Sequence, residues 1–85
     1  MRQRDMAGHF AVVLQKQRKA KGISQEILAE KADCDSTMIS LIERKIRNPT
    51  LNLADSLAQG LETPLSQLIK EAEELRSKQR PAKKR

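Results

Sequence analysis

The sequence has almost no aromatic residues: one phenylalanine and neither tryptophan nor tyrosine in 85 residues. A buried core must therefore be built from leucine, isoleucine, valine, alanine and methionine. The one cysteine cannot form an intrachain disulfide, which is typical of the reducing cytosol. No apolar run approaches the roughly 20 residues of a membrane span, and the opening segment MRQRDMAGHF has no signal-peptide pattern. We therefore expect a cytoplasmic protein with an aliphatic core and no membrane partner.

The chain is rich in Lys, Glu, Gln, Ala and Leu, which favour helices. No segment alternates apolar and polar residues as a strand would, and there is no internal repeat. A chain of this length has room for one domain. The expected fold class is therefore all-α.

The formal net charge of +6 is concentrated at one end of the chain. The last ten residues, RSKQRPAKKR, contain six lysine or arginine residues and no acidic one, whereas the preceding residues hold eleven basic and eleven acidic side chains. A nucleic-acid partner must therefore be argued from the arrangement of charge on the body and not from the total.

Start and stop signals divide the chain into five short helices. Apolar residues first recur at helical spacing from Phe10, and Gly22 ends that helix. Asn48–Pro49 stops a helix that ends near Arg44–Lys45. The start signals of the other helices are Ser24, Asp35, Thr50 or Asn52, and the pair Thr63–Pro64, a capping hydroxyl with proline at the first helical position.

These signals give three segments. Residues 1–8 are predicted to be a flexible N-terminal arm, and residues 9–75 the folded domain. Residues 76–85 are predicted to be a disordered basic tail, because they contain Pro81 and a run of like charges.

The second and third helices are separated by only a few residues, as in a helix-turn-helix. Ala29 is small where the helices meet, and Asp33 tolerates the positive φ of the turn. Cys34 can fill the core after the turn, while Ile39 and Ile42 are spaced for burial on the third helix. Because no metal-ligand spacing or activating histidine lies near Cys34, we favour core packing over a reactive thiol.

The segment ISQEILAEKADCDSTMISLIERKIRNPTLNLADSLAQGLE resembles the Cro and phage-repressor (Xre) type of helix-turn-helix domain. The resemblance extends from about Phe10 to Ile69 and rests on ISQE, LAEKA, STMISLIER, RNPT and LAQGLE, followed by Pro64. It implies a five-helix, lambda-repressor-like fold whose second and third helices form the motif. It also implies dimeric binding to operator DNA through a major-groove helix, with no catalytic role and no cofactor.

The resemblance places DNA-binding residues at named positions. Those where family members contact bases are Ser36, Thr37, Ser40 and Leu41. Those near the DNA backbone are Gln25 with Ser24 beside it, and Arg44, Lys45, Arg47 and Asn48. Without this pattern, the hydroxyl side chains would simply be a solvated helix face. In some relatives the positions of Arg18 and Glu43 form a partly buried ion pair, which would make Arg18 architectural.

The sequence departs from the family pattern at two positions. Asp33 stands where the turn usually has glycine, and aspartate visits the left-handed region more readily than most residues. Lys45 stands where glycine usually follows IER. There it is expected to strain the end of the helix and to add a cation near phosphates.

The last helix can be interpreted in two ways. Its apolar residues either pack only on the core or form the dimer contact, since the family usually dimerises through this end. We favour the dimer contact, which assigns dimerisation to Leu65, Leu68, Ile69, Ala72 and Leu75.

The implied function is that of a sequence-specific transcriptional regulator, most often a repressor, bound as a homodimer to an inverted repeat. Small plasmid, phage and restriction-modification controller regulators are similar, which implies a bacterial, plasmid or phage origin. The alternative is the antitoxin of a toxin–antitoxin pair, with a toxin as protein partner of the tail. An enzyme is disfavoured, because the sequence has no carboxylate pair, His/Cys cluster or phosphate-binding loop at usable spacing.

Overall fold

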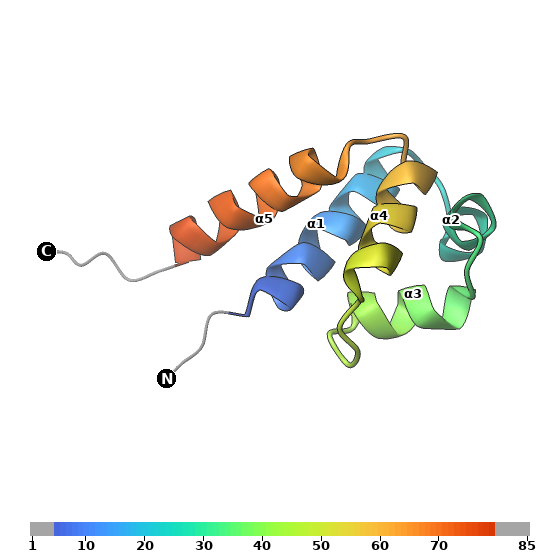
Figure 1. The fold of residues 1–85 in the computed structure, drawn as a ribbon, viewed down its shortest axis with the longest axis horizontal. Helices are drawn as coiled ribbons and strands as arrows, with labels where there is room; N and C mark the ends of the chain where they lie inside the picture. The colour runs from blue at the N-terminus through green and yellow to red at the C-terminus, as the bar shows by residue number, and fades with distance from the viewer. Residues whose placement is uncertain (1–4, 80–85) are drawn as a thin grey trace, which may run out of the picture.

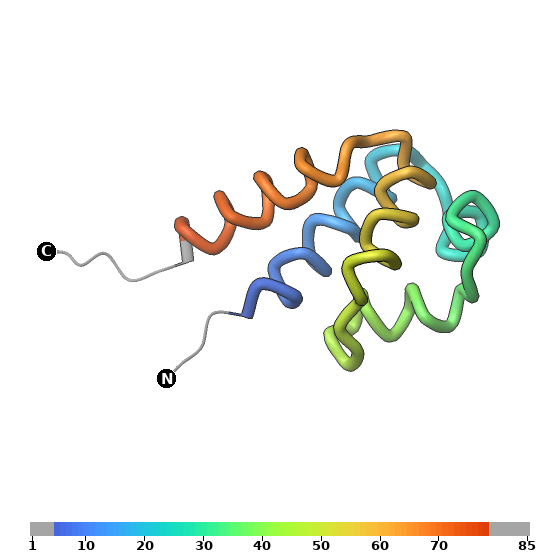
Figure 2. The backbone as a smooth tube through the Cα atoms, in the orientation of Figure 1, coloured from blue at the N-terminus to red at the C-terminus, as the bar shows by residue number. Residues whose placement is uncertain are grey.

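The computed structural model describes residues 5–79, which form five α-helices (Figures 1 and 2). The helices are α1 (Met6–Ala20), α2 (Gln25–Ala32), α3 (Ser36–Glu43), α4 (Leu51–Gly60) and α5 (Leu65–Gln79). No strand occurs in this range, and the all-α prediction is confirmed. Helices α1 and α5 lie side by side and extend away from a head formed by α2, α3 and α4 (Figure 1).

One aliphatic core joins all five helices. Phe10 is buried within it, as the one aromatic residue of the chain. Each fully buried leucine or isoleucine contributes about 1.5–3 kcal/mol, so the motif helices are held firmly against the rest of the domain. The largest fully buried side chains are Leu14, Leu28, Ile39, Ile42, Leu57, Leu61 and Leu68.

Helix α1 begins earlier than the sequence predicted. The carboxylate of Asp5 accepts a hydrogen bond from the backbone N–H of Gly8 at 3.0 Å, which caps the helix. The prediction of a flexible arm is therefore wrong for residues 6–8, and residues 1–4 lie outside the described part. Gly22 has a φ of 70° just after the helix, as expected for a glycine that ends it.

The turn before α5 is closed differently from the prediction. The Thr63 hydroxyl donates to the Leu61 carbonyl at 3.2 Å, so it stabilises the preceding turn. The Pro64 carbonyl accepts from the Gln67 N–H at 2.9 Å, and the helix begins at Leu65. The predicted capping role of Thr63 and helical position of Pro64 are therefore wrong.

Helix α5 extends to Gln79, so the prediction of a disordered tail from residue 76 is wrong for residues 76–79. Arg76 and Lys78 lie in its last turn, where positive charge is favoured by the exposed carbonyl groups. The other basic residues of the predicted tail lie outside the described range: Arg80, Lys83, Lys84 and Arg85.

Gly60 allows α4 to pack closely on α2. A Cβ atom at this position would lie 3.0 Å from Leu28 Cδ1 and 3.2 Å from the backbone nitrogen of Ala32. A larger residue would therefore push α2 and the turn that follows it away from α4.

Glu71 joins α5 to α1 through its carboxylate. The Gln17 side-chain amide donates to both Glu71 oxygens at 3.0 and 3.1 Å, and the Gln67 amide donates to Oε2 at 2.9 Å. The hydrogen bonds from Gln67 and, to a smaller extent, Gln17 lower the pKa of Glu71 below its ordinary value. Partial burial raises this pKa by less, and the charge of Lys16 lowers it further.

The lowered pKa of Glu71 predicts a pH-dependent contribution to stability. A carboxyl group whose pKa is lowered in the folded state stabilises the fold at pH values above its ordinary pKa of 4.5. This contribution is lost as the pH falls below 4.5 and through the lower pKa of the folded state. Glu71→Gln is therefore expected to lower the free energy of unfolding at neutral pH by up to about 1 kcal/mol. The difference from wild type should vanish in acid. Urea unfolding at neutral and acidic pH measures it, and an equal difference at both pH values would contradict the assignment.

Candidate nucleic-acid interface

The turn between α2 and α3 has the geometry expected of a helix-turn-helix. Asp33 ends α2 in the left-handed region, with φ 58° and ψ 50°, as predicted. Ser24 Oγ caps α2 by accepting from the Ile27 N–H at 3.1 Å. Asp35 caps α3 by accepting from the Thr37 N–H at 3.0 Å. Both caps confirm the sequence prediction, and they set the directions of the two motif helices.

Cys34 lies inside this turn, half-buried and packed against the core. Its backbone N–H donates to the Ala29 carbonyl at 2.9 Å. Burial, followed by the charges of Asp35 and Asp33, raises the pKa of the Cys34 thiol above its ordinary value. Because the thiolate is the reactive form, this environment favours a packing role over nucleophilic chemistry.

Helix α3 forms one edge of the molecule, and its outer side faces away from the other helices (Figure 1). Ile39 and Ile42 point into the core, as predicted. Thr37 is exposed on the opposite side. The other three residues of the predicted base-reading set are half-exposed: Ser36, Ser40 and Leu41.

The loop after α3 presents three cations and an amide to solvent. These residues are Arg44, Lys45, Arg47 and Asn48, and all four are exposed. The N–H groups of Ile46 and Arg47 both donate to the Leu41 carbonyl, at 2.9 and 3.2 Å, which ties the loop to the helix. Lys45 has a φ of 65°, so the expected backbone strain is present. A non-glycine residue there costs about 1 kcal/mol, and its charge lies beside the end of α3.

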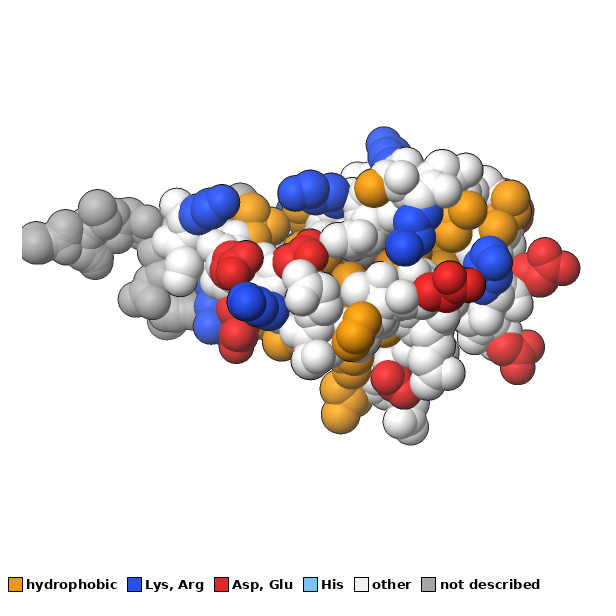
Figure 3. Space-filling model, turned by 90° about the horizontal axis from the view of Figure 1, so that it is seen from above, with side chains coloured by type: hydrophobic (Ala, Val, Ile, Leu, Met, Phe, Trp, Pro, Cys, Tyr) orange, Lys and Arg blue, Asp and Glu red, His pale blue; other side chains and the backbone are white. Residues whose placement is uncertain are grey.

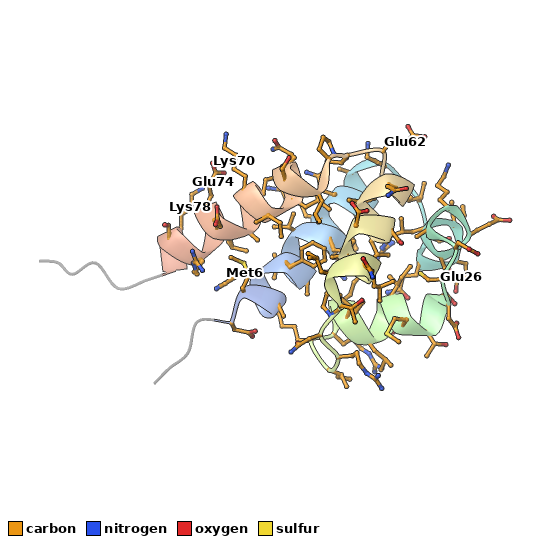
Figure 4. All side chains as sticks on the ribbon, viewed as in Figure 1. Met6, Glu26, Glu62, Lys70, Glu74 and Lys78 are labelled. Carbon is orange, nitrogen blue, oxygen red and sulfur yellow. The ribbon has the colours of Figure 1, made fainter. Side chains whose placement is uncertain are left out.

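Among residues 5–79, the side of the molecule opposite α3 has no comparable cluster of like charges. Seen from the side away from α3, lysine and arginine side chains alternate with aspartate and glutamate (Figure 3). Lys70, Glu74 and Lys78 follow one another at four-residue intervals along α5 (Figure 4), where opposite charges pair favourably. Glu74 and Lys78 line the groove between α1 and α5. The α3 side is therefore the better candidate for binding a polyanion.

Arg18 and Glu43 form the ion pair expected between the first and third helices. Arg18 Nε lies 2.8 Å from Glu43 Oε2, and Arg18 Nη2 donates to Oε1 at 3.0 Å. The third nitrogen, Nη1, donates to the Ile23 carbonyl at 2.9 Å. The hydrogen bond with Glu43 raises the pKa of Arg18 more than burial lowers it. Arg18 is therefore architectural, as predicted.

Gln25 is engaged inside the protein in a way that the sequence did not reveal. Its side-chain Nε2 donates to Glu43 Oε1 at 2.9 Å, and the residue is half-buried at the start of α2. Ser24 is exposed beside it. The two predicted phosphate contacts thus lie together at one end of α2, with Gln25 bonded to the last residue of α3.

The assignment of two α5 residues to a dimer contact is wrong. Leu68 and Ala72 have no exposed surface and belong to the core of the single chain, so they cannot touch a partner. Leu65 and Ile69 are half-buried against this core. Leu75 is half-buried in a groove of about 460 Å³ between α1 and α5. For these three residues the dimer contact stays a prediction.

Two apolar side chains near α3 are much more exposed. Ile46 is 63% exposed and Leu51 is 74% exposed, at the beginning of the α3–α4 loop and the start of α4. Sequence reasoning did not single out Leu51, because the spacing of one apolar residue beside a helix cap does not distinguish an exposed position from a core position.

Within residues 5–79, no three His, Cys, Asp or Glu side chains gather closely enough to hold a metal ion. None of the helices in this range is long and apolar enough to cross a bilayer.

A family model described as "Helix-turn-helix" matches residues 14–68, which is more than half of the chain. The chain therefore belongs to the helix-turn-helix family of the Cro and phage-repressor (Xre) type, whose members are DNA-binding regulators and not enzymes.

Solved structures give more specific comparisons. The wild-type restriction-modification controller protein C.Esp1396I is 36% identical, with 85% of this chain and 99% of that chain covered and a TM-score of 0.73. The restriction-modification controller protein C.AhdI from Aeromonas hydrophila is 34% identical, with 73% and 94% covered and a TM-score of 0.70. The clp gene regulator ClgR from Corynebacterium glutamicum shares the fold at 22% identity, with 87% and 79% covered and a TM-score of 0.81. A search of curated proteins found no match.

Proposed function

We propose that this protein is a sequence-specific transcriptional repressor that binds an inverted-repeat operator as a homodimer. The observation that carries the proposal is the exposed outer side of α3, with Thr37 pointing to solvent on the second helix of the motif. In this family the corresponding helix enters the major groove and its N-terminal residues contact base edges. Restriction-modification controller proteins are among its relatives, which supports a role in controlling genes.

Base reading is assigned to four side chains of α3. The hydroxyls of Ser36, Thr37 and Ser40 can donate to or accept from base edges, and Leu41 can meet a thymine methyl group. Three hydroxyls form few bidentate contacts, so part of the specificity should come from the shape and deformability of the operator.

Phosphate binding is assigned to the ends of the motif. Arg44, Lys45 and Arg47 supply positive charge and Asn48 a hydrogen-bonding amide beyond the end of α3. Ser24 and Gln25 supply neutral donors at the start of α2. These contacts fix the position of α3 in the groove without carrying sequence information.

Thr37→Ala is expected to relax base preference at one position of each half-site. The lost hydroxyl contact should reduce discrimination there by about 1–3 kcal/mol, because no other residue takes its place at the centre of the exposed side. Binding to a selected operator and to its single-base variants measures the change. If Thr37→Ala weakens binding to the operator and to every single-base variant equally, so that the base preference is intact, Thr37 does not read bases.

For the dimer, we propose an interface around Ile46 and Leu51. Helix α3 and the C-terminal end of α5 lie toward opposite ends of the molecule, whose longest dimension is 46 Å (Figure 1). A two-fold contact at the far end of α5 would place the two α3 helices at the extremes of an elongated dimer. A contact beside the α3–α4 loop brings them much closer to the separation of about 34 Å that one DNA turn requires.

Leu51→Lys is expected to shift the protein from dimer to monomer, because the substitution buries an unpaired charge in the proposed apolar contact. Sedimentation equilibrium measures the change in mass, and unchanged circular dichroism shows that the fold is kept. Leu75→Lys, in the groove between α1 and α5, is the matched control and should remain dimeric. Loss of the dimer in Leu75→Lys alone would favour the α5 contact predicted from the sequence.

A further inference from the structure

A polar network links the two ends of the helix-turn-helix that lie away from its turn. Gln25 is the first residue of α2 and Glu43 is the last residue of α3. Their side chains meet where Gln25 Nε2 donates to Glu43 Oε1 at 2.9 Å. The same Oε1 accepts from Arg18 Nη2 at 3.0 Å. The network therefore fixes the position of the Gln25 side chain relative to the end of the reading helix.

We propose that Glu43 is a positioning residue for DNA binding, which holds the side-chain amide of Gln25 in the orientation needed to donate to a backbone phosphate. This inference rests on the proposed DNA-binding function and assigns a second role to the ion pair. The contact to phosphate is made by Gln25, and Glu43 acts only through it.

The orientation follows from the chemistry of the two groups. An ionised carboxylate only accepts hydrogen bonds, so the nitrogen end of the Gln25 amide must face Glu43. The nitrogen carries two N–H groups, and Glu43 accepts one of them. The second is left to donate to a phosphate. A freely rotating amide would present its oxygen to the phosphate part of the time, and two acceptors repel each other.

The ion pair also removes an electrostatic obstacle. Glu43 directly precedes Arg44 in the proposed interface, and an uncompensated carboxylate there would repel phosphates. Arg18 faces it with two nitrogens, and the side chain of Glu43 is only 1% exposed. The negative charge is therefore neutralised within the protein, and only its hydrogen-bonding effect reaches Gln25.

The proposed contact between Gln25 and a phosphate should affect the salt dependence of DNA affinity differently from a contact made by a cation. A cation that binds phosphate releases counterions, so its loss flattens the plot of log K against log salt. The Gln25 amide is neutral, so its loss should lower affinity at every salt concentration and leave the slope unchanged. This property separates the Gln25 contact from the contacts of Arg44 and Arg47.

The experiment compares the full-length wild type with three variants: Gln25→Ala, the pair Arg18→Met/Glu43→Met, and the triple variant that combines them. Replacing both members of a buried ion pair by apolar residues often preserves stability, so the pair variant removes the acceptor of Gln25 without leaving a lone charge. Binding to a fluorescent mixed-sequence duplex about three turns long is measured by anisotropy over a range of salt concentrations.

The expected result is that Gln25→Ala and the Met pair each weaken binding by about tenfold per subunit with unchanged slope, and that the triple variant binds no more weakly than the Met pair. If adding Gln25→Ala to the Met pair weakens binding by the same factor as adding it to the wild type, the two sites act independently and the inference is overturned. Failure of the wild type to bind any duplex would instead overturn the proposed function.

A second measurement covers the case in which the Met pair does not fold. Side-chain 15N relaxation of Gln25 in the wild type should show a rigid amide in the free protein, and both Nε2 proton resonances should shift when the same duplex is added. A mobile amide, or resonances that do not respond to the duplex, would overturn the inference.

Discussion

Replacement of Glu43 by alanine is expected to destabilise the fold by about 3–5 kcal/mol. The substitution leaves the Arg18 guanidinium in place with its main partner removed, although its side chain is only 10% exposed. Small domains are stable by about 5–15 kcal/mol, so the variant should be close to unfolding at room temperature. Urea unfolding followed by circular dichroism measures the loss.

The control for this prediction is the pair Arg18→Met/Glu43→Met, which removes both charges together. Its free energy of unfolding should lie within about 1–2 kcal/mol of the wild-type value, because no unpaired buried charge remains. A loss below about 1 kcal/mol for Glu43→Ala would contradict the account, since that is the size expected of a solvent-exposed ion pair.

The double substitution Arg44→Gln/Arg47→Gln is expected to weaken binding to all DNA sequences by at least about a hundredfold per subunit at low salt. Each lost charged contact costs about 1.5–3 kcal/mol, and two contacts are lost per subunit. Each phosphate contact contributes about 0.9 to the slope of log K against log salt, so a dimer that loses four should lose about 3.6. Anisotropy titrations across a salt series measure both quantities.

A variant with the same change in net charge provides the control. Lys70→Gln/Lys78→Gln removes two cations from α5, remote from α3 (Figure 4). Affinity and slope should stay close to those of the wild type, because exposed charges farther away than the Debye length of about 10 Å are largely screened. Equal losses in both double variants would mean that overall charge, and not the loop after α3, drives binding.

Much of the fold could be predicted because its signals are local. Ser24, Asp35 and Thr50 each cap a helix through a hydrogen bond to a residue two or three positions later. The left-handed turns at Asp33 and Lys45 were inferred from positions where the family has glycine. Interactions across so few residues can be recognised without knowing the tertiary structure.

The errors arose where a local pattern allows two structures. Thr63 before a proline has the appearance of a helix cap, but its hydroxyl bonds back to Leu61. The sequence from 76 to 79 is polar enough for a tail, yet it continues α5. The spacing of Leu68 and Ala72 suits a partner helix as well as the core of the same chain, and only the packing of α5 on α1 decides between them.

The candidate site was predictable in its exposed residues and not in its internal contacts. The outward position of Thr37 follows from the helical period once Ile39 and Ile42 are placed inside. The bond between Gln25 and Glu43 joins residues 18 positions apart. It depends on how α2 and α3 are inclined to each other, which no pattern within either helix specifies.

The central claim, sequence-specific binding by a dimer, is tested most directly by selecting bound duplexes from a randomised pool with the full-length protein at physiological salt. We expect enrichment of an inverted repeat whose half-site centres are about 10 base pairs apart, or a multiple of that spacing. The preference should weaken when Thr37 is replaced. Recovery of a pool with no shared sequence, bound only through salt-sensitive contacts, would contradict the claim.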